Sequence, residues 1–169
     1  MTADRGAGTP FQRGLGIHWE EIDDEPGAMA AVLDVTTQVR GPAGSLEGGV
    51  IATLVDCAGG AAAARALGAI VATEHLTLSF LAPGKVGPVR AEGRLLRVGR
   101  RDAVVDVRVF DVGNTGRLMA VAQMTMRSLG RPLPDFSQVG AAGFGPPGPD
   151  PGPDLGPDPA QRTSHAPPQ

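Results

Sequence analysis

Hydrophobic and polar residues follow patterns that divide the chain into short strands and one long apolar helix. Residues 47–68 carry apolar or small side chains on all sides of a helix, which would be roughly 30 Å long at about 1.5 Å rise per residue. A helix of this kind is expected to be buried. It ends at Gly68, a residue type that is common at helix C-termini. We therefore take this helix as the central element of the fold.

Two strands are predicted before the helix. Apolar and polar residues alternate over residues 15–22, the period of a half-buried strand. Residues 23–27 read as a turn, and residues 29–39 are rich in β-branched side chains, so a second strand antiparallel to the first is expected. Residues 1–13 show no periodicity, and we expect a flexible N-terminal arm there.

Four more strands are predicted after the helix, at residues 75–81, 89–98, 103–111 and 117–128. Short turns between consecutive strands indicate an antiparallel meander. One helix that is apolar all round and one antiparallel sheet can cover each other only if the sheet curls around the helix. This arrangement is the hotdog fold, an α+β fold, and we expect it to occupy residues 14–130. The missing cover of the helix would come from a second copy of the chain.

The C-terminal segment has a different composition. Nine of the sixteen prolines lie between residues 146 and 168, among glycines and aspartates, so residues 131–169 are expected to form a Pro/Gly-rich disordered tail. Hydrophobic residues make up 41% of the 169 residues, enough for the core of one domain.

Charge and cysteine content exclude several classes of function. The net charge of -3, without a dense basic face, argues against a general nucleic-acid or membrane-surface binder. The single cysteine, Cys57, rules out an intramolecular disulfide and fits a reducing compartment. There is no apolar N-terminal leader and no run of about 18 apolar residues, so a cytoplasmic protein is expected. No metal-ligand spacing or phosphate-binding glycine loop is present, and we expect no metal and no cofactor.

The chemistry is concentrated on the central helix. Gly48 and Gly49 open it, where backbone N–H groups lack intrahelical partners and could bind the carbonyl oxygen of an ester or thioester. Asp56, an ionisable residue in an apolar helix, lies eight positions after Gly48, about 12 Å along the axis. A base or nucleophile and an oxyanion donor must both lie within about 3 Å of the reacting group. Two antiparallel copies of the helix would bring Gly48 of one chain to Asp56 of the other, which predicts a homodimer with two composite sites.

A groove is expected beside Asp56. Small residues surround it at helical spacing, which would leave room for a slender pantetheine-like arm or for a close helix crossing; they are Gly49, Thr53, Gly60 and Ala63. Cys57 points away from this face and is interpreted as a small core residue. The three histidines, His18, His75 and His165, are interpreted as non-catalytic.

Two stretches carry a resemblance to a known family. The sequence EGGVIATLVDCA, followed by TEHLTLSFLAPGKVGPVRAEGRLLRVGRR, resembles the PaaI-type (phenylacetate-pathway type) acyl-CoA thioesterases of the hotdog superfamily. The resemblance covers roughly residues 15–129. It implies that Gly48 supplies the oxyanion N–H and that Asp56 activates water or attacks the thioester. It further implies that Thr73, at the start of the next strand, positions the water.

The chain departs from the family pattern at two places. The family's histidine before the glycine pair is replaced by Glu47, and the asparagine often found in the preceding loop has no counterpart in residues 41–44. Glu47 stands beside the helix N-terminus. It would repel an anionic ligand there or serve as a second acid.

Basic residues near strand ends supply a possible phosphate site. Arg97, Arg100 and Arg101 cluster there, with Lys85 as an outlier, and would suit the phosphates of coenzyme A. The alternative is that they are solvated charges of a turn.

These observations bear on three functions. The leading prediction is an acyl-CoA thioesterase, acting as a homodimer or a dimer of dimers on an acyl-CoA substrate. The alternative is a non-enzymatic acyl-CoA-binding or ligand-sensing hotdog protein, which the replacement at Glu47 favours. A hydratase or dehydratase is disfavoured, because such enzymes pair a carboxylate with a histidine and the helix contains none.

Overall fold

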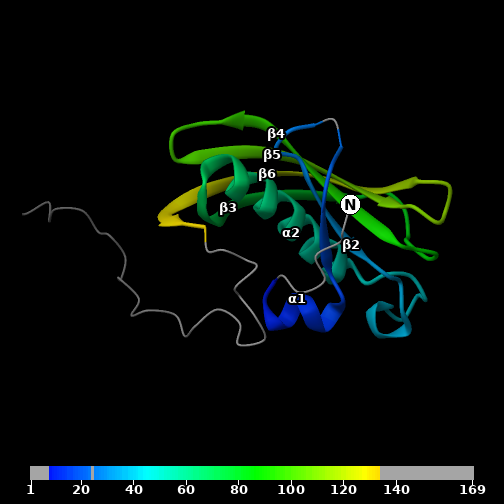
Figure 1. Cartoon of the computed structure of the whole chain (residues 1–169). Helices are drawn as coiled ribbons and strands as arrows, with labels where there is room; N and C mark the ends of the chain where they lie inside the picture. Colours follow the sequence, from blue (N-terminus) through cyan, green and yellow to red (C-terminus); the bar gives the residue numbers. More distant parts are fainter. Residues whose placement is uncertain (1–7, 24, 134–169) are drawn as a thin grey trace, which may run out of the picture.

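The computed structural model describes residues 8–23 and 25–133, in which one long helix packs against a curved sheet of six antiparallel strands (Figure 1). The helix is α2, Gly48–Leu67. This confirms the predicted hotdog fold. The strands are β1 His18–Glu21, β2 Met29–Leu33, β3 Ala69–Phe80, β4 Val89–Val98, β5 Asp102–Asp111 and β6 Arg117–Pro132.

The central helix has the predicted limits. Gly68 follows it with φ 60°, in the left-handed region that glycine adopts easily, and its N–H donates to the Ala64 carbonyl. One face of α2 packs into the core through Ile51, Leu54, Val55, Cys57, Ala58, Gly59, Ala62 and Ala63. The prediction of all-round burial is wrong for the single chain, because the described residues leave the opposite face, with Asp56, exposed.

Among the described helices, α2 is the one long and apolar enough to cross a membrane. It is also the core helix of this fold, and one of its faces packs against the sheet. The cytoplasmic location expected from the sequence stays a prediction.

Glycine allows the helix and sheet to approach closely. A Cβ atom on Gly93 of β4 would lie 2.6 Å from the Ala58 carbonyl oxygen of α2, too close for any side chain. Val105, Val107 and Val109 of β5 are fully buried on the same side of the sheet, as their alternation predicts. The core therefore lies between α2 and the concave face of the sheet.

The strand order is β1-β2-β4-β5-β6-β3. The predicted meander is confirmed for β4, β5 and β6, but it is wrong for β3. This strand pairs with β6 at the end of the sheet, and β4 pairs with β2 instead. Loop residues 81–88 carry the chain across the end of the sheet to reach β4. Alternation in a sequence defines the two faces of a strand, but it does not define the neighbours of the strand.

Strand β3 also begins earlier than predicted. It starts at Ala69, directly after the turn at Gly68, whereas the alternation predicted a start at residue 75. A register shift between Thr73 and His75 breaks the alternation at this point and explains the difference. Thr73 therefore lies inside the strand and not at its start.

The N-terminal region contains a helix that was not predicted. Pro10–Leu15 form α1, so the expected flexible arm is wrong from residue 10 onward, and residues 1–7 lie outside the described residues. Thr9 and Gln12 cap this helix through a reciprocal capping box, and Gly16 ends it with φ 78°. The strand predicted over residues 15–22 is shortened to His18–Glu21 as a result.

Strand β2 ends earlier than predicted. It pairs antiparallel with β1, as expected, but it stops at Leu33 instead of residue 39. Its other neighbour, β4, begins at Val89 opposite Leu33, so no partner continues beyond this point. Thr37–Val39 form a short 3-10 helix, η1, instead.

The C-terminal end of the domain lies in β6. This strand reaches Pro132, two residues past the predicted domain end, and the predicted tail from residue 134 lies outside the described residues.

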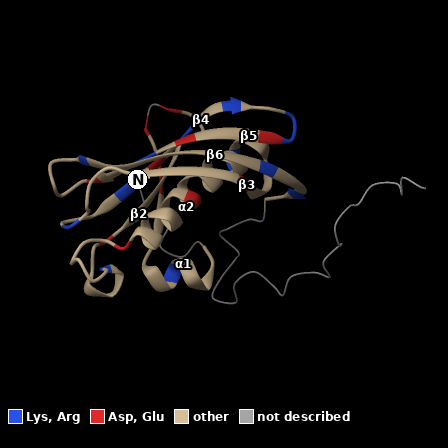
Figure 2. Ribbon diagram, turned by 180° about the vertical axis from the view of Figure 1, so that it is seen from behind, with Lys and Arg blue, Asp and Glu red and all other residues tan. Residues whose placement is uncertain are grey.

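Charged residues are spread along the strands of the sheet (Figure 2). On β4 they alternate with the buried residues Val89, Ala91 and Gly93, so their side chains lie on the face that points away from α2. Arg94 contacts Glu25 at 2.6 Å and Glu92 at 2.9 Å, and Arg90 contacts Glu92 at 3.0 Å. Arg90 also pairs with Glu20. The acids and bases of this outer face neutralise one another, and the predicted site residues on α2 lie on the other side of the sheet.

Candidate active site

The first turn of α2 presents backbone donors at the surface. Glu47 precedes the helix in an extended conformation, and its side chain makes no capping hydrogen bond. Gly48 and Gly49 are exposed. The first N–H groups of a helix have no partner within it, and the helix macrodipole adds partial positive charge there. This end of α2 can therefore donate hydrogen bonds to the carbonyl oxygen of a ligand.

An aromatic ring stands beside these donors. Phe80, the last residue of β3, has ring atoms 3.6 and 3.7 Å from the position that a Cβ on Gly48 would occupy, and the residue is 57% exposed. Its ring therefore lies against the first turn of α2. The sequence could not show that it reaches Gly48, because that depends on how β3 is aligned along the helix.

Asp56 forms a hydrogen bond with a second predicted site residue. The Thr73 hydroxyl of β3 donates to the Asp56 carboxylate at 2.7 Å, and both residues are exposed. Thr53, three residues before Asp56 on α2, donates its hydroxyl to the Gly49 carbonyl at 3.0 Å instead. Since Asp56 lies at the surface, its charge needs no buried partner. The free side of its carboxylate remains available to a ligand.

Gly48 and Asp56 of one chain do not form one site. They belong to the same straight helix and lie eight residues apart, or about 12 Å along its axis. Thr73 lies beside Asp56, and Phe80 lies beside Gly48. One chain therefore carries two half-sites, one with the donors and one with the carboxylate.

The groove expected beside Asp56 stays a prediction, and the small residues expected to line it differ in exposure. Gly49 is exposed and Thr53 and Gly60 are half-buried, but Ala63 is fully buried and belongs to the core face of α2. Strand β3 runs alongside this exposed face and pairs only with β6 among the described strands. The exposed face of α2 and the free edge of β3 therefore form one continuous surface around Asp56 and Thr73.

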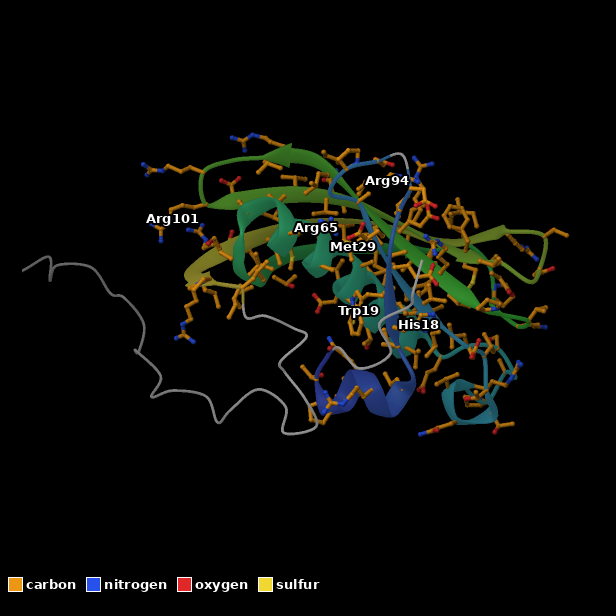
Figure 3. The ribbon with its side chains drawn as sticks, viewed as in Figure 1. His18, Trp19, Met29, Arg65, Arg94 and Arg101 are labelled. Atoms are coloured by element: carbon orange, nitrogen blue, oxygen red, sulfur yellow. The ribbon has the colours of Figure 1, made fainter. Side chains whose placement is uncertain are left out.

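The three arginines lie at the end of the sheet that is nearer to Thr73 than to Phe80 in the strand register. Arg97 ends near Asp102, with 3.3 Å between its guanidinium and the carboxylate, while Arg100 and Arg101 are exposed in the β4–β5 turn. Figure 3 shows Arg101 projecting from that turn into solvent. The Ser128 N–H donates to the Arg101 carbonyl at 2.8 Å, and Ser128 pairs with Val71, two residues before Thr73.

Lys85, the basic residue set apart in the sequence, lies at the opposite end. Its neighbour Gly84 accepts a hydrogen bond from the Leu46 N–H at 2.8 Å, just before α2 begins. The structure therefore separates Lys85 from the arginines. In one chain, the arginines lie with the carboxylate half-site and away from the Gly48 donors.

Cys57 is a poor nucleophile in this environment. Burial, with the negative charge of Asp56 as a smaller contribution, raises the pKa of the Cys57 thiol to about 12. The Gln12 amide donates to its sulfur at 3.3 Å, which ties α1 to α2. These contacts agree with its interpretation as a core residue.

The histidines have other partners. His75 hydrogen-bonds Thr77 at 3.0 Å on the outer side of β3, and His18 lies 3.5 Å from Glu20. His165 lies outside the described residues.

Within residues 8–23 and 25–133, no three His, Cys, Asp or Glu side chains gather into a metal-binding group. A cleft of about 130 Å³ lies elsewhere, lined by Arg13, Gly16, Ile17, His18 and Asp34.

Comparison with known proteins gives a consistent picture. Residues 43–126 match the family model of the thioesterase superfamily. A candidate esterase of Halobacterium salinarum is 33% identical over 122 residues, which are 69% of this chain and 78% of the relative. A candidate esterase of Saccharolobus solfataricus is 34% identical over 103 residues, 60% of this chain and 66% of the relative. The 1,4-dihydroxy-2-naphthoyl-CoA hydrolase of Listeria monocytogenes is 28% identical over 118 residues, 69% of this chain and 93% of the relative.

Solved structures agree on the fold. The PaaI protein of Escherichia coli, from the phenylacetic acid degradation operon, superposes with a TM-score of 0.66 at 23% identity, over 73% of this chain and 87% of that one. A Streptococcus mutans protein solved with acetyl-CoA bound superposes with a TM-score of 0.60 at 27% identity, over 68% of this chain and 91% of that one.

Proposed function

Since the chain belongs to the thioesterase superfamily, we propose that it hydrolyses an acyl-CoA thioester to a free acid and coenzyme A. The observation that carries this proposal is the hydrogen bond of 2.7 Å between Thr73 and Asp56, on a surface that the single chain leaves open. It holds a carboxylate in a fixed orientation on the face of α2 that carries Gly49, Thr53 and Gly60. A carboxylate so placed can serve as a general base or as a nucleophile.

The complete site is proposed to form between two chains. An antiparallel partner placed on the exposed face of α2 would bring its Asp56 and Thr73 to the Gly48 N–H of the first chain. The free edge of β3 supports this arrangement, because unpaired strand edges are suited to pairing with a second copy. We expect a homodimer or a dimer of dimers.

The proposed reaction assigns one role to each residue. The thioester carbonyl oxygen accepts the Gly48 N–H, which stabilises the negative charge that develops on this oxygen. Asp56 removes a proton from water, whose oxygen then attacks the carbonyl carbon, while Thr73 holds the carboxylate in position. The carbon–sulfur bond breaks, and the coenzyme A thiolate leaves and takes up a proton. Alternatively, Asp56 attacks the carbonyl carbon directly, and water hydrolyses the resulting anhydride.

Substrate contacts follow from the half-sites. A pantetheine arm would lie along Gly49 and Thr53. The phosphates of coenzyme A would contact Arg100 and Arg101. Arg97 would contact the phosphates while it also pairs with Asp102. The names of the relatives include an aromatic acyl-CoA hydrolase, and one neighbour was solved with acetyl-CoA. A screen should therefore contain aryl and short aliphatic acyl-CoA esters.

The test is thiol release from such a panel by the wild-type protein and by Asp56→Asn. We expect turnover of at least one ester, and a loss of about 100-fold or more in kcat for the variant, because a general base contributes about that much. Asp106→Asn is the matched control, since this carboxylate lies on the outer face of the sheet beside Arg108. Equal rates for Asp56→Asn and the wild type would refute the role of Asp56.

A non-enzymatic acyl-CoA-binding protein is the second candidate. It is favoured by Glu47, an acidic residue directly before the proposed oxyanion donors whose side chain makes no capping hydrogen bond. A developing negative charge on the substrate would be repelled there. Tight binding of acyl-CoA esters without release of thiol, measured by calorimetry beside the same panel, would select this candidate.

A further inference from the structure

A buried carboxylate holds the loop beside the N-terminus of α2. Asp111, the last residue of β5, is 0% exposed, and no other charged side chain is buried in the part of the chain that the structure describes. It accepts hydrogen bonds from three consecutive backbone N–H groups, those of Lys85 at 2.9 Å, Val86 at 3.1 Å and Gly87 at 2.7 Å. Three charge-assisted bonds to one carboxylate fix the position of this loop closely.

The loop in turn contacts the segment that leads into α2. The Gly84 carbonyl accepts the Leu46 N–H at 2.8 Å, and Leu46 is two residues before Gly48. A Cβ on Gly84 would lie 2.2 Å from the Met119 side chain and 3.7 Å from the Leu46 side chain, so Gly84 packs closely beside both residues. A shift of the loop would therefore move the start of the helix.

A guanidinium binds the same segments from the other side. Arg40 donates to three backbone carbonyls, those of Gly44 at 2.7 Å, Lys85 at 2.9 Å and Val35 at 3.3 Å. The Glu47 N–H donates to the carbonyl of Val39, the neighbour of Arg40, at 3.0 Å. The planar fork of an arginine suits several oxygens at once, which lysine cannot reproduce. Arg40 forms no salt bridge within the described residues, so these carbonyls are its contacts.

We infer that Arg40 and Asp111 are positioning residues that set the direction of the Gly48 N–H toward the thioester carbonyl. The inference rests on the proposed function, in which this N–H stabilises the oxyanion. Neither side chain touches the substrate. Each acts through the backbone of residues 44–47 or 84–87, and the two contact networks meet at Lys85.

Substitution of either positioning residue should slow the chemical step of the reaction. An oxyanion donor acts mainly in the transition state, so a misdirected N–H lowers kcat and leaves KM nearly unchanged. Displacements of about 1 Å in an active site cost about 100-fold in rate. Arg40 lies partly at the surface, so its substitution should not disrupt the core.

The experiment compares Arg40→Met, Arg40→Lys and Arg94→Met with the wild type on the best acyl-CoA ester. We expect kcat to fall about tenfold or more in Arg40→Met with KM within about threefold, and partial recovery in Arg40→Lys. Arg94→Met is the matched control, because Arg94 is also half-buried but pairs with Glu25 and Glu92 on the outer face.

A second measurement does not depend on activity. Amide hydrogen exchange should accelerate at Leu46 and Glu47, whose N–H groups donate to the Gly84 and Val39 carbonyls, in Arg40→Met and in Asp111→Asn, while the middle of α2 stays protected. Unchanged kcat in Arg40→Met, or unchanged exchange at Leu46 and Glu47, would overturn the inference even if Asp56→Asn is inactive. If the wild type hydrolyses none of the esters, the proposed function fails first, and the inference about catalysis fails with it.

Discussion

At the scale of single residues, the site depends on which side chains lie beside a carboxylate and beside a pair of glycines. Thr73 and Asp56 are seventeen positions apart in the sequence and meet at 2.7 Å because β3 runs back along α2. Periodicity cannot reveal such a contact. It follows from the alignment of strand and helix, and the family resemblance alone pointed to Thr73.

Glu47 stands where the family that the sequence resembles typically has a histidine. Glu47 directly precedes Gly48, and its side chain makes no capping hydrogen bond. In Glu47→Gln we predict an increase in kcat/KM of about fivefold, because the repulsion between two exposed charges near 4 Å is about 1 kcal/mol in water. The gain should shrink with added salt, which screens exposed charges. Steady-state kinetics at low and high ionic strength give both quantities.

The control for this prediction is Glu21→Gln. Glu21 is an exposed glutamate on β1 that pairs with Arg65, away from the donors. If Glu47→Gln is slower than the wild type, Glu47 contributes to the reaction as an acid, and its interpretation as a repelling charge is wrong.

At the scale of elements, patterns that repeat along one segment were predicted well. The limits of α2 and β4 and nearly those of β5 follow from the sequence, because burial on one face imposes a period. Helix α1 was missed although Thr9, Pro10, Gln12 and Gly16 are its local signals, since it is too short to show periodicity. The place of β3 beside β6 could not be predicted, because it depends on contacts between distant segments.

The loop that Asp111 holds should give the fold a pH dependence. Burial opposes the charged form, but the N–H groups of Lys85, Gly87 and Val86 outweigh it and hold the pKa of Asp111 below its ordinary value of 3.8. A lowered pKa in the folded state means that the unfolded chain binds more protons in this range. The contribution of Asp111 to the free energy of unfolding is therefore complete above pH 3.8 and is lost as the pH falls through the lower folded value.

We predict that the wild type exceeds Asp111→Asn by about 2 kcal/mol in the free energy of unfolding at pH 7. This difference should shrink progressively below about pH 4. Urea unfolding of both proteins between pH 3 and 7 measures it, with Asp106→Asn as the control. A difference that stays constant over this range would show that the charge of Asp111 is not responsible.

At the scale of the whole molecule, one chain displays two incomplete halves of a site. The donors of Gly48 and the carboxylate of Asp56 lie about 12 Å apart on one rigid helix. The exposed face of α2 and the free edge of β3 offer the surface on which a second copy would complete both halves. The central claim is therefore that catalysis requires residues from two chains.

Subunit complementation tests this claim most directly. Gly48→Pro removes the proposed donor at the first position of a helix, where proline is tolerated, and Asp56→Ala removes the carboxylate. Each variant alone should be inactive. After the two are unfolded together and refolded, a random mixture contains about half heterodimers, each with one intact site, so about a quarter of the wild-type activity should return. A mixture that stays as inactive as its components would contradict a site shared between chains.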